Sequence, residues 1–405
     1  MYRIYLRILP LLIIFVAILA CSASAPFTIE DSSTPAHEGY TQAVEKNITE
    51  STPTSVYLPV VEKSNPVFFG YIGKVYWTKE NVEKHMPEVD NLAGKKHTAV
   101  GWFIDIQDPA FYEDWETESA LNRNNLYRQL ERLWEKGYLS FIKIGSTDTA
   151  QSIIEGKYDN RLTQMAKIYL RWVQKGGGRK AMLAPLQEMN GDWVDYYSEG
   201  LSIGQKQDLY KQAYRKIQLV FEQNGVNRSM VWWVFAANGL SSPDVPENNF
   251  EYYYPGDEYI DLVGIASYNY GFCQATLNPL CLDGDCGRWE TYDQLFEPYI
   301  RRLEAMAPGK PILITETGTS AIFRKEDRPD KYNYAEKSKW LIENYAYLAS
   351  QPSVLGIFYF DLDEFDGTAC DLKIPRGINF TGYRSAISHS AFQYLPVSEL
   401  DKHIP

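Results

Sequence analysis

The chain has 405 residues, of which 45% are hydrophobic and 23% are charged, so it can bury one large core or two ordinary ones and is not disordered as a whole. Its 40 basic and 52 acidic residues give a formal net charge of -12 at pH 7, and a surface of this charge repels phosphate backbones, which argues against nucleic acid as a partner. Aromatic residues make up 14% of the chain, which fits either a tyrosine-rich core and surface or a groove that stacks against sugar rings.

The N-terminal residues are typical of an export signal. Arg3 and Arg7 precede an apolar run, Ile8–Ala20, that is short for a membrane-spanning helix. The run ends in Ile18-Leu19-Ala20-Cys21, which is similar to a bacterial lipoprotein signal in which Cys21 becomes the lipidated first residue. We therefore expect residues 1–21 to be a signal segment and the protein to be a cell-envelope lipoprotein. Secretion after cleavage at Ala25 and an uncleaved anchor are the alternatives.

The composition changes at about residue 65. Residues 22–64 are rich in Ser, Thr, Pro and Glu without apolar periodicity, which predicts a flexible linker. Residues 65–400 instead alternate short β-branched and aromatic runs with longer helical patterns. The predicted strands are Val67–Ile72, Thr98–Ile104, Leu139–Ile144, Ala181–Leu186, Ser229–Ala236, Leu262–Ser267, Pro311–Thr315 and Val354–Phe360. The predicted helices include Leu126–Lys136, Arg161–Lys175, Gln205–Asn224, Tyr292–Ala307 and Tyr334–Ser350.

Eight strand-then-helix units predict an α/β fold of the (β/α)8 or TIM-barrel type. A doubly wound open sheet is the alternative. It is disfavoured because no glycine-rich phosphate loop follows a predicted strand; Gly176, Gly177 and Gly178 follow a predicted helix and are better explained as its stop and turn.

The fourth predicted strand ends next to a glutamate. Gln187 and Glu188 follow it directly, and Trp193 lies five residues beyond Glu188. A carboxyl group beside aromatic surface is partly desolvated, and desolvation raises a carboxyl pKa toward the range that a general acid needs. Glu188 is therefore a candidate general acid. A structural glutamate paired with a lysine at the rim is the alternative.

A second glutamate follows the seventh predicted strand. Glu316 comes directly after Thr315, and Gly318 would allow a sharp turn beside a ligand. In a (β/α)8 barrel the strand ends meet at one face, where catalytic residues lie. Two carboxyl groups that project there toward one cleft are what cleavage of a glycosidic bond requires.

Both motifs resemble those of glycoside hydrolase family 26, which holds β-mannanases and some lichenase-type and β-1,3-xylanase members. Residues 185–193, Pro-Leu-Gln-Glu-Met-Asn-Gly-Asp-Trp, are similar to the family's acid/base motif, and residues 314–318, Ile-Thr-Glu-Thr-Gly, to its nucleophile motif. Residues 261–269 are similar to its sixth strand and residues 154–159 to a segment before its fourth strand. The resemblance extends from about residue 68 to residue 365, with the motifs in the family's order.

The resemblance implies a retaining mechanism with Glu188 as acid/base and Glu316 as nucleophile, whose carboxyl groups should lie ~5–5.5 Å apart. It also implies that Tyr268 orients Glu316 and that Trp193 lines the cleft near the cleaved bond. Asn190 and Asn269 are weaker candidates for substrate contact. A turn-type hydrogen bond that holds the loop is the alternative for Asn190.

Two departures from the family pattern affect the expected specificity. The family usually has His directly before the acid/base and Arg four residues before it, whereas this chain has Gln187 and Ala184. Glutamine can still bind substrate through hydrogen bonds but does not titrate. Loss of the arginine raises the pKa of the nucleophile unless another cation compensates. Lys143, near the end of the third predicted strand, is a candidate for that cation, and a lysine at the rim is the alternative.

Further polar or aromatic residues at predicted strand ends are candidates for substrate binding, with core packing or loop capping as the alternative for each. They are Trp102, Asp105, Trp233, Phe235, Asn238, Asp361 and Asp363. Because side chains alternate along a strand, only one of the adjacent Trp232 and Trp233 faces the barrel interior.

Four cysteines besides Cys21 predict two disulfides in an exported chain, with three pairings open. They are Cys273, Cys281, Cys286 and Cys370. All four follow the sixth or eighth predicted strand, so crosslinks between them would stiffen loops at the catalytic face. The five histidines are far from these cysteines in sequence, so we expect no zinc site.

These features predict an endo-acting glycoside hydrolase that cleaves a β-linked polysaccharide by double displacement, with β-1,4-mannan as the first substrate. β-Glucan and xylan are alternatives within the family. A carbohydrate-binding surface lipoprotein on a decayed barrel, or an enzyme that trims or transfers polymer exported by its own cell, are further alternatives. The chemistry needs no metal or organic cofactor. We expect a monomer that contacts a membrane only through its N-terminal lipid.

Overall fold

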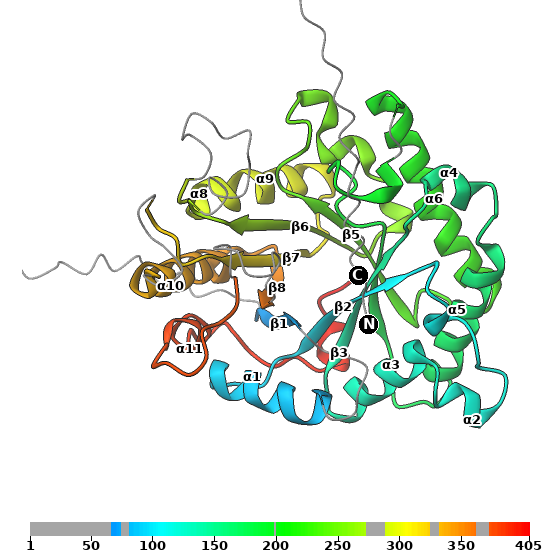
Figure 1. The fold of residues 1–405 in the computed structure, drawn as a ribbon, viewed down its shortest axis with the longest axis horizontal. Coiled ribbons are helices and arrows are strands. Elements are labelled where there is room, and N and C mark those ends of the chain that lie inside the picture. The colour runs from blue at the N-terminus through cyan, green and yellow to red at the C-terminus, as the bar shows by residue number, and fades with distance from the viewer. Residues whose placement is uncertain (1–65, 74–80, 198–199, 273–287, 325–331, 362–371) are drawn as a thin grey trace, which may run out of the picture. The chain divides into compact units, whose positions relative to one another are not determined.

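A computed structural model describes residues 66–73, 81–197, 200–272, 288–324, 332–361 and 372–405. Eight parallel strands form a closed barrel in sequence order, and β1 pairs with β8 to complete it (Figure 1). The predicted (β/α)8 barrel is confirmed, and each predicted run overlaps one strand. The strands are β1 (Phe68–Gly73), β2 (Ala99–Asp105), β3 (Leu139–Gly145), β4 (Ala181–Pro185), β5 (Val231–Asn238), β6 (Leu262–Asn269), β7 (Ile312–Thr319) and β8 (Val354–Asp361).

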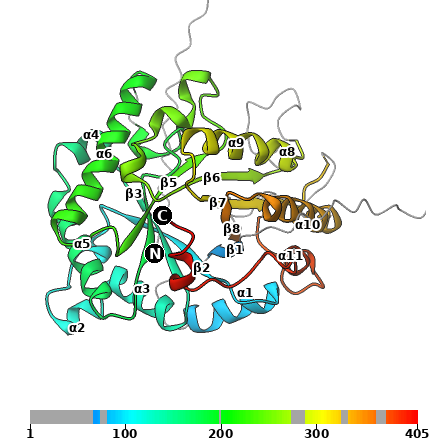
Figure 2. The ribbon, with the colours of Figure 1, turned by 180° about the vertical axis from the view of Figure 1, so that it is seen from behind.

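Helices surround the barrel, as Figure 2 shows from behind. Those in the described residues are α1 (Met86–Ala93), α2 (Glu118–Leu121), α3 (Asn125–Glu135), α4 (Ala150–Ile154), α5 (Asp159–Val173), α6 (Ile203–Gln223), α8 (Tyr292–Leu295), α9 (Glu297–Met306), α10 (Tyr334–Ser350), α11 (Gly382–Ile387) and α12 (Val397–Leu400). None of them combines the length and hydrophobicity that a membrane-crossing helix needs.

The helices begin and end where local signals predict. In α3 the Asn124 side chain accepts a hydrogen bond from the Tyr127 backbone N–H, and the buried Leu126, Leu130 and Leu133 recur on one face. Helix α5 ends before Gly176, Gly177 and Gly178, which all have positive φ, as predicted for a stop and turn.

The helical pattern predicted over residues 292–307 forms two helices. Helix α8 ends at Leu295, and α9 begins at Glu297 with Pro298 in its first turn. Proline has no N–H to bond the preceding turn, so the chain restarts there instead of continuing one helix.

Aromatic side chains fill the barrel interior. The rings of Phe68 (β1) and Phe141 (β3) contact the ring of Phe358 (β8), with centroids 5.7 and 4.8 Å apart. Gly70 and Gly356 face these rings, and a Cβ at either position would overlap a phenylalanine ring. The interior is therefore a packed core, as in other barrels of this type.

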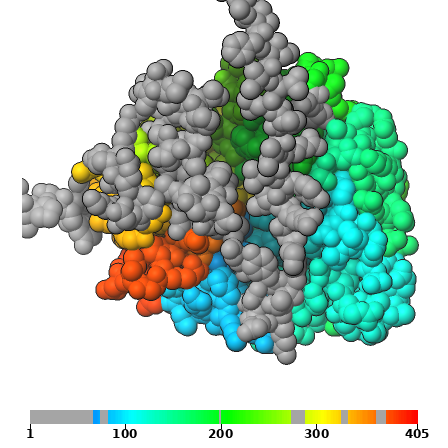
Figure 3. Space-filling model, viewed as in Figure 1, coloured from blue at the N-terminus to red at the C-terminus, as the bar shows by residue number. Residues whose placement is uncertain are grey.

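The C-terminal segment closes the N-terminal end of the barrel. Leu395, Leu400 and Ile404 join the interior hydrophobic cluster, and the Leu395 backbone N–H donates to Thr98, directly before β2. Helix α11 also lies beside α1 (Figure 3), and the Arg384 side chain on α11 donates a hydrogen bond to the backbone carbonyl of Asn91 on α1. The C-terminal residues thus pack against both the barrel interior and the first helix of the described chain.

Several predicted features lie outside the described residues. They are Cys21, Cys273, Cys281, Cys286, Cys370 and Asp363. The lipid attachment and the two disulfides therefore stay predictions.

Candidate active site

Five polar or charged side chains lie near the C-terminal ends of five consecutive strands, from β3 to β7. Lys143 is on β3, Glu188 follows β4, Asn238 ends β5, Tyr268 is on β6 and Glu316 is on β7. Parallel strands in a closed barrel all end at one face, and this is the face where (β/α)8 enzymes place their active sites.

The turn after β4 holds Glu188 in an unusual backbone conformation. Leu186 and Glu188 have φ values of 53° and 57°, which non-glycine residues rarely adopt. Their backbone N–H groups donate to the carbonyls of Ile144 and Ala236 at 2.8 Å, so neighbouring strands fix the turn. Such strain typically costs about 1–3 kcal/mol per residue and concentrates at functional sites.

Two neutral donors hold the Glu188 carboxylate. Trp193 Nε1 donates to Oε2 at 2.9 Å, and Asn238 Nδ2 donates to Oε1 at 3.0 Å. The Trp193 ring folds over Gly191, where any Cβ would overlap it, and 52% of Trp193 remains exposed. Glu188 itself is half-buried. A carboxyl group beside an exposed aromatic ring is accessible to a sugar that stacks there.

A β-bulge directs Glu316 into the barrel. Ile312 and Ile314 on β7 pack outward among the helices, and strict alternation would send Glu316 the same way. However, the register with β6 shifts at this point: Ile265 pairs with Ile314, and Ala266 pairs with Glu316. The extra residue, Thr315, reverses the alternation and turns the Glu316 side chain inward.

Glu316 is held by a hydroxyl and a cation. Tyr268 donates from its hydroxyl to Oε2, as the family resemblance implies, and Lys143 forms an ion pair with Oε1. Only 4% of Glu316 is exposed. The strand β7 continues through Glu316 to Thr319, so this carboxylate lies within a strand and not in a loop.

Lys143 is buried in the barrel interior. It is 1% exposed, and its Nζ lies 5.2 Å from the ring centroid of Phe103 and 5.4 Å from that of Phe141. Burial lowers the pKa of Lys143 to about 7, against the opposing effect of the Glu188 charge. The alternative of a lysine at the rim is therefore wrong, because Lys143 is enclosed and paired with Glu316.

The arrangement provides two carboxylates in different surroundings. Glu188 is accessible and bound by neutral donors, whereas Glu316 is enclosed and paired with a cation. Environments of this kind separate the roles of two carboxylates in glycosidic bond cleavage. In the described part of the chain no group of three or more His, Cys, Asp or Glu side chains could hold a metal ion.

The remaining predicted residues on these loops have mixed outcomes. Gln187 is partly exposed, whereas its Oε1 atom is buried and has no hydrogen-bond partner. Asn190 is fully buried, donates to the Asn238 carbonyl and accepts from the Asn238 N–H. Its substrate-binding prediction is wrong, because its amide joins the loops after β4 and β5. Asn269 is equally buried and bonds Thr319.

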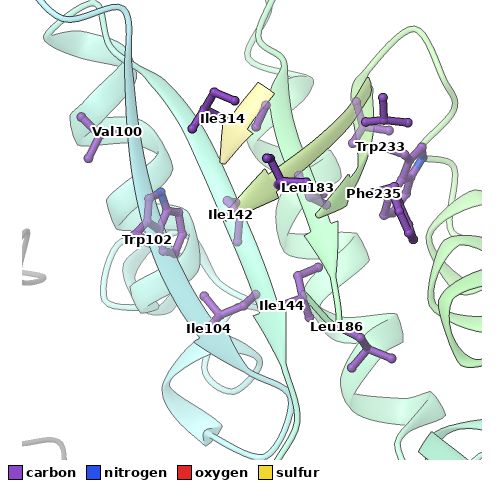
Figure 4. Close-up of a cluster of buried hydrophobic side chains, with 14 of the residues drawn as sticks. Val100, Trp102, Ile104, Ile142, Ile144, Leu183, Leu186, Trp233, Phe235 and Ile314 are labelled. Atoms are coloured by element: carbon purple, nitrogen blue, oxygen red, sulfur yellow. The ribbon is translucent and has the colours of Figure 1, made fainter. Parts of the chain in front are cut away.

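The prediction that Trp102 and Trp233 bind substrate is also wrong. Both belong to the layer between strands and helices, with exposures of 3% and 0%, and Phe235 joins them there (Figure 4). Side chains alternate along a strand, and these three residues occupy the positions that point away from the barrel interior. Trp232 faces inward, but it lies near the start of β5, with its ring 4.2 Å from Lys180 Nζ.

Two aspartates at strand ends have different surroundings. Asp361 is 4% exposed and accepts hydrogen bonds from Tyr71, Arg376 and the Ile374 N–H, so it anchors chain segments. Asp105 remains partly exposed at the end of β2, and burial raises its pKa, with the charge of Asp108 adding to the effect.

The sequence contained a signal that Lys143 faces the barrel interior, but a lysine is ordinarily expected at the surface. Lys143 shares the inward parity of Leu139 and Phe141, so strand alternation alone places it in the interior. For Asn238 the only signal is its place at a strand end, which does not predict contact with Glu188. Phe103 beside Lys143 carried no functional signal at all.

Comparisons with known proteins show that part of the chain is similar to one enzyme family. The model of glycosyl hydrolase family 26 matches residues 148–277, which include Glu188 and Tyr268. Endoglucanase H of Acetivibrio thermocellus is 31% identical over 270 residues, 65% of this chain and 24% of that protein. A mannan endo-1,4-β-mannosidase of Bacillus subtilis is 31% identical over 121 residues, 29% of this chain and 31% of that protein. The chain thus spans less than a third of the length of these relatives.

Solved structures share the fold. The catalytic domain of a family 26 endo-β-1,4-mannanase from Bacillus sp. JAMB-750 has a TM-score of 0.54 and 16% identity, over 83% of this chain and 89% of that chain. A family 26 β-mannanase from Bacteroides ovatus has a TM-score of 0.53 and 14% identity, over 84% of this chain and 95% of that chain. The family model and the sequence relatives show that the chain is similar to glycoside hydrolase family 26, and the solved structures show that it shares the barrel fold of that family's enzymes.

Proposed function

We propose that this protein is an endo-acting glycoside hydrolase that cleaves β-linked polysaccharide by double displacement. The observation that carries the proposal is the pair of glutamates after β4 and on β7, one accessible and one enclosed beside a cation. A decayed, purely binding barrel is disfavoured because the strained turn at Glu188 and the bulge at Glu316 are both present. Strain of this kind persists where function requires it.

The two glutamates then have separate roles. Glu188 donates its proton to the glycosidic oxygen as the bond to the anomeric carbon breaks, and Glu316 attacks that carbon from the opposite face. The leaving sugar departs as an alcohol, and an ester joins the remaining sugar to Glu316. Glu188, now a carboxylate, removes a proton from water while the water oxygen attacks the anomeric carbon and releases Glu316. Two inversions leave the configuration unchanged.

Two candidate substrates are supported by two different relatives. β-1,4-Mannan is the first, because the Bacillus subtilis relative is a mannan endo-1,4-β-mannosidase. β-Glucan is the second, because the match to Endoglucanase H covers 65% of the chain. Gln187, which is partly exposed, stands where the family pattern has histidine, and it is the residue most suited to alter the choice between these sugars.

The test is release of reducing ends from mannan, β-glucan and xylan by wild type, Glu188→Ala and Glu316→Ala proteins. Glu222→Ala, on an exposed position of α6, is the matched control. We expect wild type and Glu222→Ala to release reducing ends from at least one polymer and both site variants to lose that activity. Activity that survives both site substitutions contradicts the mechanism. Binding without cleavage by wild type on every polymer favours the binding-protein alternative.

We also propose that a lipid on Cys21 attaches the protein to the cell envelope, on the strength of the sequence pattern around that residue. Expression in a bacterial host with a labelled fatty acid should label the wild type and leave Cys21→Ser unlabelled. Equal labelling of both proteins, or labelling of neither, contradicts this attachment.

A further inference from the structure

Lys143 occupies a position that structural stability alone explains poorly. Its ammonium is enclosed, and its contacts are the Glu316 carboxylate, the Thr315 carbonyl at 3.4 Å, and the rings of Phe103 and Phe141. Burying an ion pair removes both charges from water, and an apolar pair of the same size is often equally stable or more so. The pair therefore calls for an explanation in the chemistry of the site.

The barrel topology places Lys143 on the strand next to β4, which Glu188 follows, and opposite β7, which carries Glu316. Strand β3 lies opposite β7 in a closed barrel of eight strands, so the lysine side chain crosses the interior to reach Glu316. Its direct neighbour in register on β4 is Ala184, a small and fully buried residue. Glu188 follows the same strand four residues later, and its charge acts on Lys143.

We propose that Lys143 is a positioning residue that serves as a single counter-ion for Glu316 and Glu188 in turn. This proposal rests on the proposed function for the order of events. Before reaction Glu316 carries the negative charge and Glu188 carries the proton, so the three groups sum to zero. When Glu188 gives its proton to the leaving oxygen and Glu316 becomes an ester, the negative charge moves to Glu188. Lys143 remains protonated, and the sum is still zero.

A shared counter-ion has a direct chemical consequence. An enclosed site of low dielectric penalises any change of net charge, because nearby water cannot reorganise around it. With Lys143 as the counter-ion of both carboxylates, the negative charge moves from Glu316 to Glu188 while the net charge of the three groups stays at zero. Ala184, a small residue beside Lys143, is the sequence change that makes room for this arrangement.

The test measures ionisation without any substrate. The carboxyl signal of Glu316 is followed by ¹³C NMR against pH in wild type and Lys143→Met, with Glu316→Gln and Glu188→Gln used to assign the signals. We expect the midpoint of Glu316 to rise by about one to three pH units in Lys143→Met, since an opposite charge at this range has that effect. Lys143→Arg, which keeps the charge, should stay close to wild type. An unchanged midpoint in Lys143→Met overturns the proposal.

A second measurement covers the event that Lys143→Met does not fold, as judged by circular dichroism. The Nζ signal of Lys143 is followed by ¹⁵N NMR in wild type, Glu316→Gln and Glu188→Gln. A shared counter-ion should lose its proton at lower pH in each glutamine variant, because a glutamate is ordinarily ionised at the pH where a lysine titrates, so each substitution removes one negative charge there. An identical midpoint in Glu188→Gln and wild type excludes sharing.

These midpoints separate the two proposals. A protein that is inactive on every polysaccharide but shows both shifts retains the counter-ion and lacks the proposed function. A protein that hydrolyses polysaccharide without these shifts retains the function and uses Lys143 only for packing. Neither result depends on the other, because no substrate is present in the titrations.

Discussion

The surroundings of Glu188 and of Glu316 are built in opposite ways. Glu188 lies in a turn, half-buried, and its two donors are the neutral groups of Trp193 and Asn238. Glu316 lies within a strand, 4% exposed, between the Tyr268 hydroxyl and the Lys143 ammonium. A group that must take and give a proton needs access to the leaving oxygen and to water. A group that must attack carbon needs to be ionised and held still. The difference supports the assignment of roles.

The largest effect is expected when each carboxyl group is removed. Glu188→Ala should lower kcat on polysaccharide by about 10²–10⁴-fold, because a sugar alkoxide leaves poorly without a proton donor. Glu316→Ala should lower it further, because no covalent intermediate forms. The measurement is hydrolysis of polysaccharide and of an aryl glycoside whose leaving group needs no protonation. Only the aryl glycoside should escape much of the loss in Glu188→Ala.

Sodium azide distinguishes the two variants by stereochemistry. In Glu316→Ala, azide fits the space of the missing carboxylate and should give a glycosyl azide of inverted configuration. In Glu188→Ala it should attack the glycosyl-enzyme ester and give retained configuration. The same configuration from both variants would contradict separate roles. The reverse pairing would exchange the roles.

The next test concerns pH and the charge on Lys143. Burial lowers the pKa of Lys143 to about 7, so the lysine is protonated below that pH and loses its charge above it. The groups that face it are Glu316 from β7, Glu188 after β4 and, through Glu316, Tyr268 from β6. If its charge is required, kcat/KM falls as pH rises through about 7. Arginine stays protonated there, so Lys143→Arg should move this alkaline limb to higher pH.

The pH profile has an internal control. Deprotonation of Glu188 would also produce an alkaline limb, because the general acid is then lost. In that case the limb stays at the same pH in Lys143→Arg. A limb that does not move therefore assigns it to Glu188 and removes Lys143 from the pH dependence.

The sequence predicted the barrel well, because eight runs with period two and intervening patterns with period 3.6 are a dense, redundant signal. Each predicted strand overlaps an observed one, and errors of one to four residues at the strand ends leave the topology unchanged. The split between α8 and α9 was a local event at Pro298 that affected nothing beyond it.

The site was predicted less completely, because it depends on which way single side chains point. Trp102 and Trp233 lie on the right strands but have outward parity. Glu316 has outward parity by simple counting and faces inward only because of the bulge at Thr315. The hydrogen bonds of Asn190 link two loops whose relative placement no local pattern encodes. The position of the motifs in the sequence identifies the two carboxylates, whereas the residues that contact them are determined by how the strands and loops pack together.

A smaller effect is expected from Trp193→Phe, which keeps the ring and removes the hydrogen bond to Glu188. A hydrogen bond to a charged group contributes about 1.5–3 kcal/mol, and the exposure of this one favours the lower end. We expect kcat/KM to fall by about tenfold, which corresponds to about 1.4 kcal/mol. Trp193→Ala should in addition raise KM, since the stacking surface is lost. A raised KM with unchanged kcat in Trp193→Phe would assign the residue to substrate binding alone.

The smallest effect on activity should come from Trp233, although it lies on the strand next to Glu188. Its side chain is fully buried between β5 and the helices, so Trp233→Ala should lower the free energy of unfolding by about 3–5 kcal/mol. Trp193→Ala, at a position that is 52% exposed, should change it little. Urea denaturation measures both, and kinetics below the transition measure activity. The two tryptophans should show opposite patterns: Trp233→Ala loses stability and keeps KM, whereas Trp193→Ala keeps stability and loses binding. If Trp233→Ala also raises KM at unchanged stability, its ring reaches the substrate, and the division between inward and outward side chains on β5 is wrong.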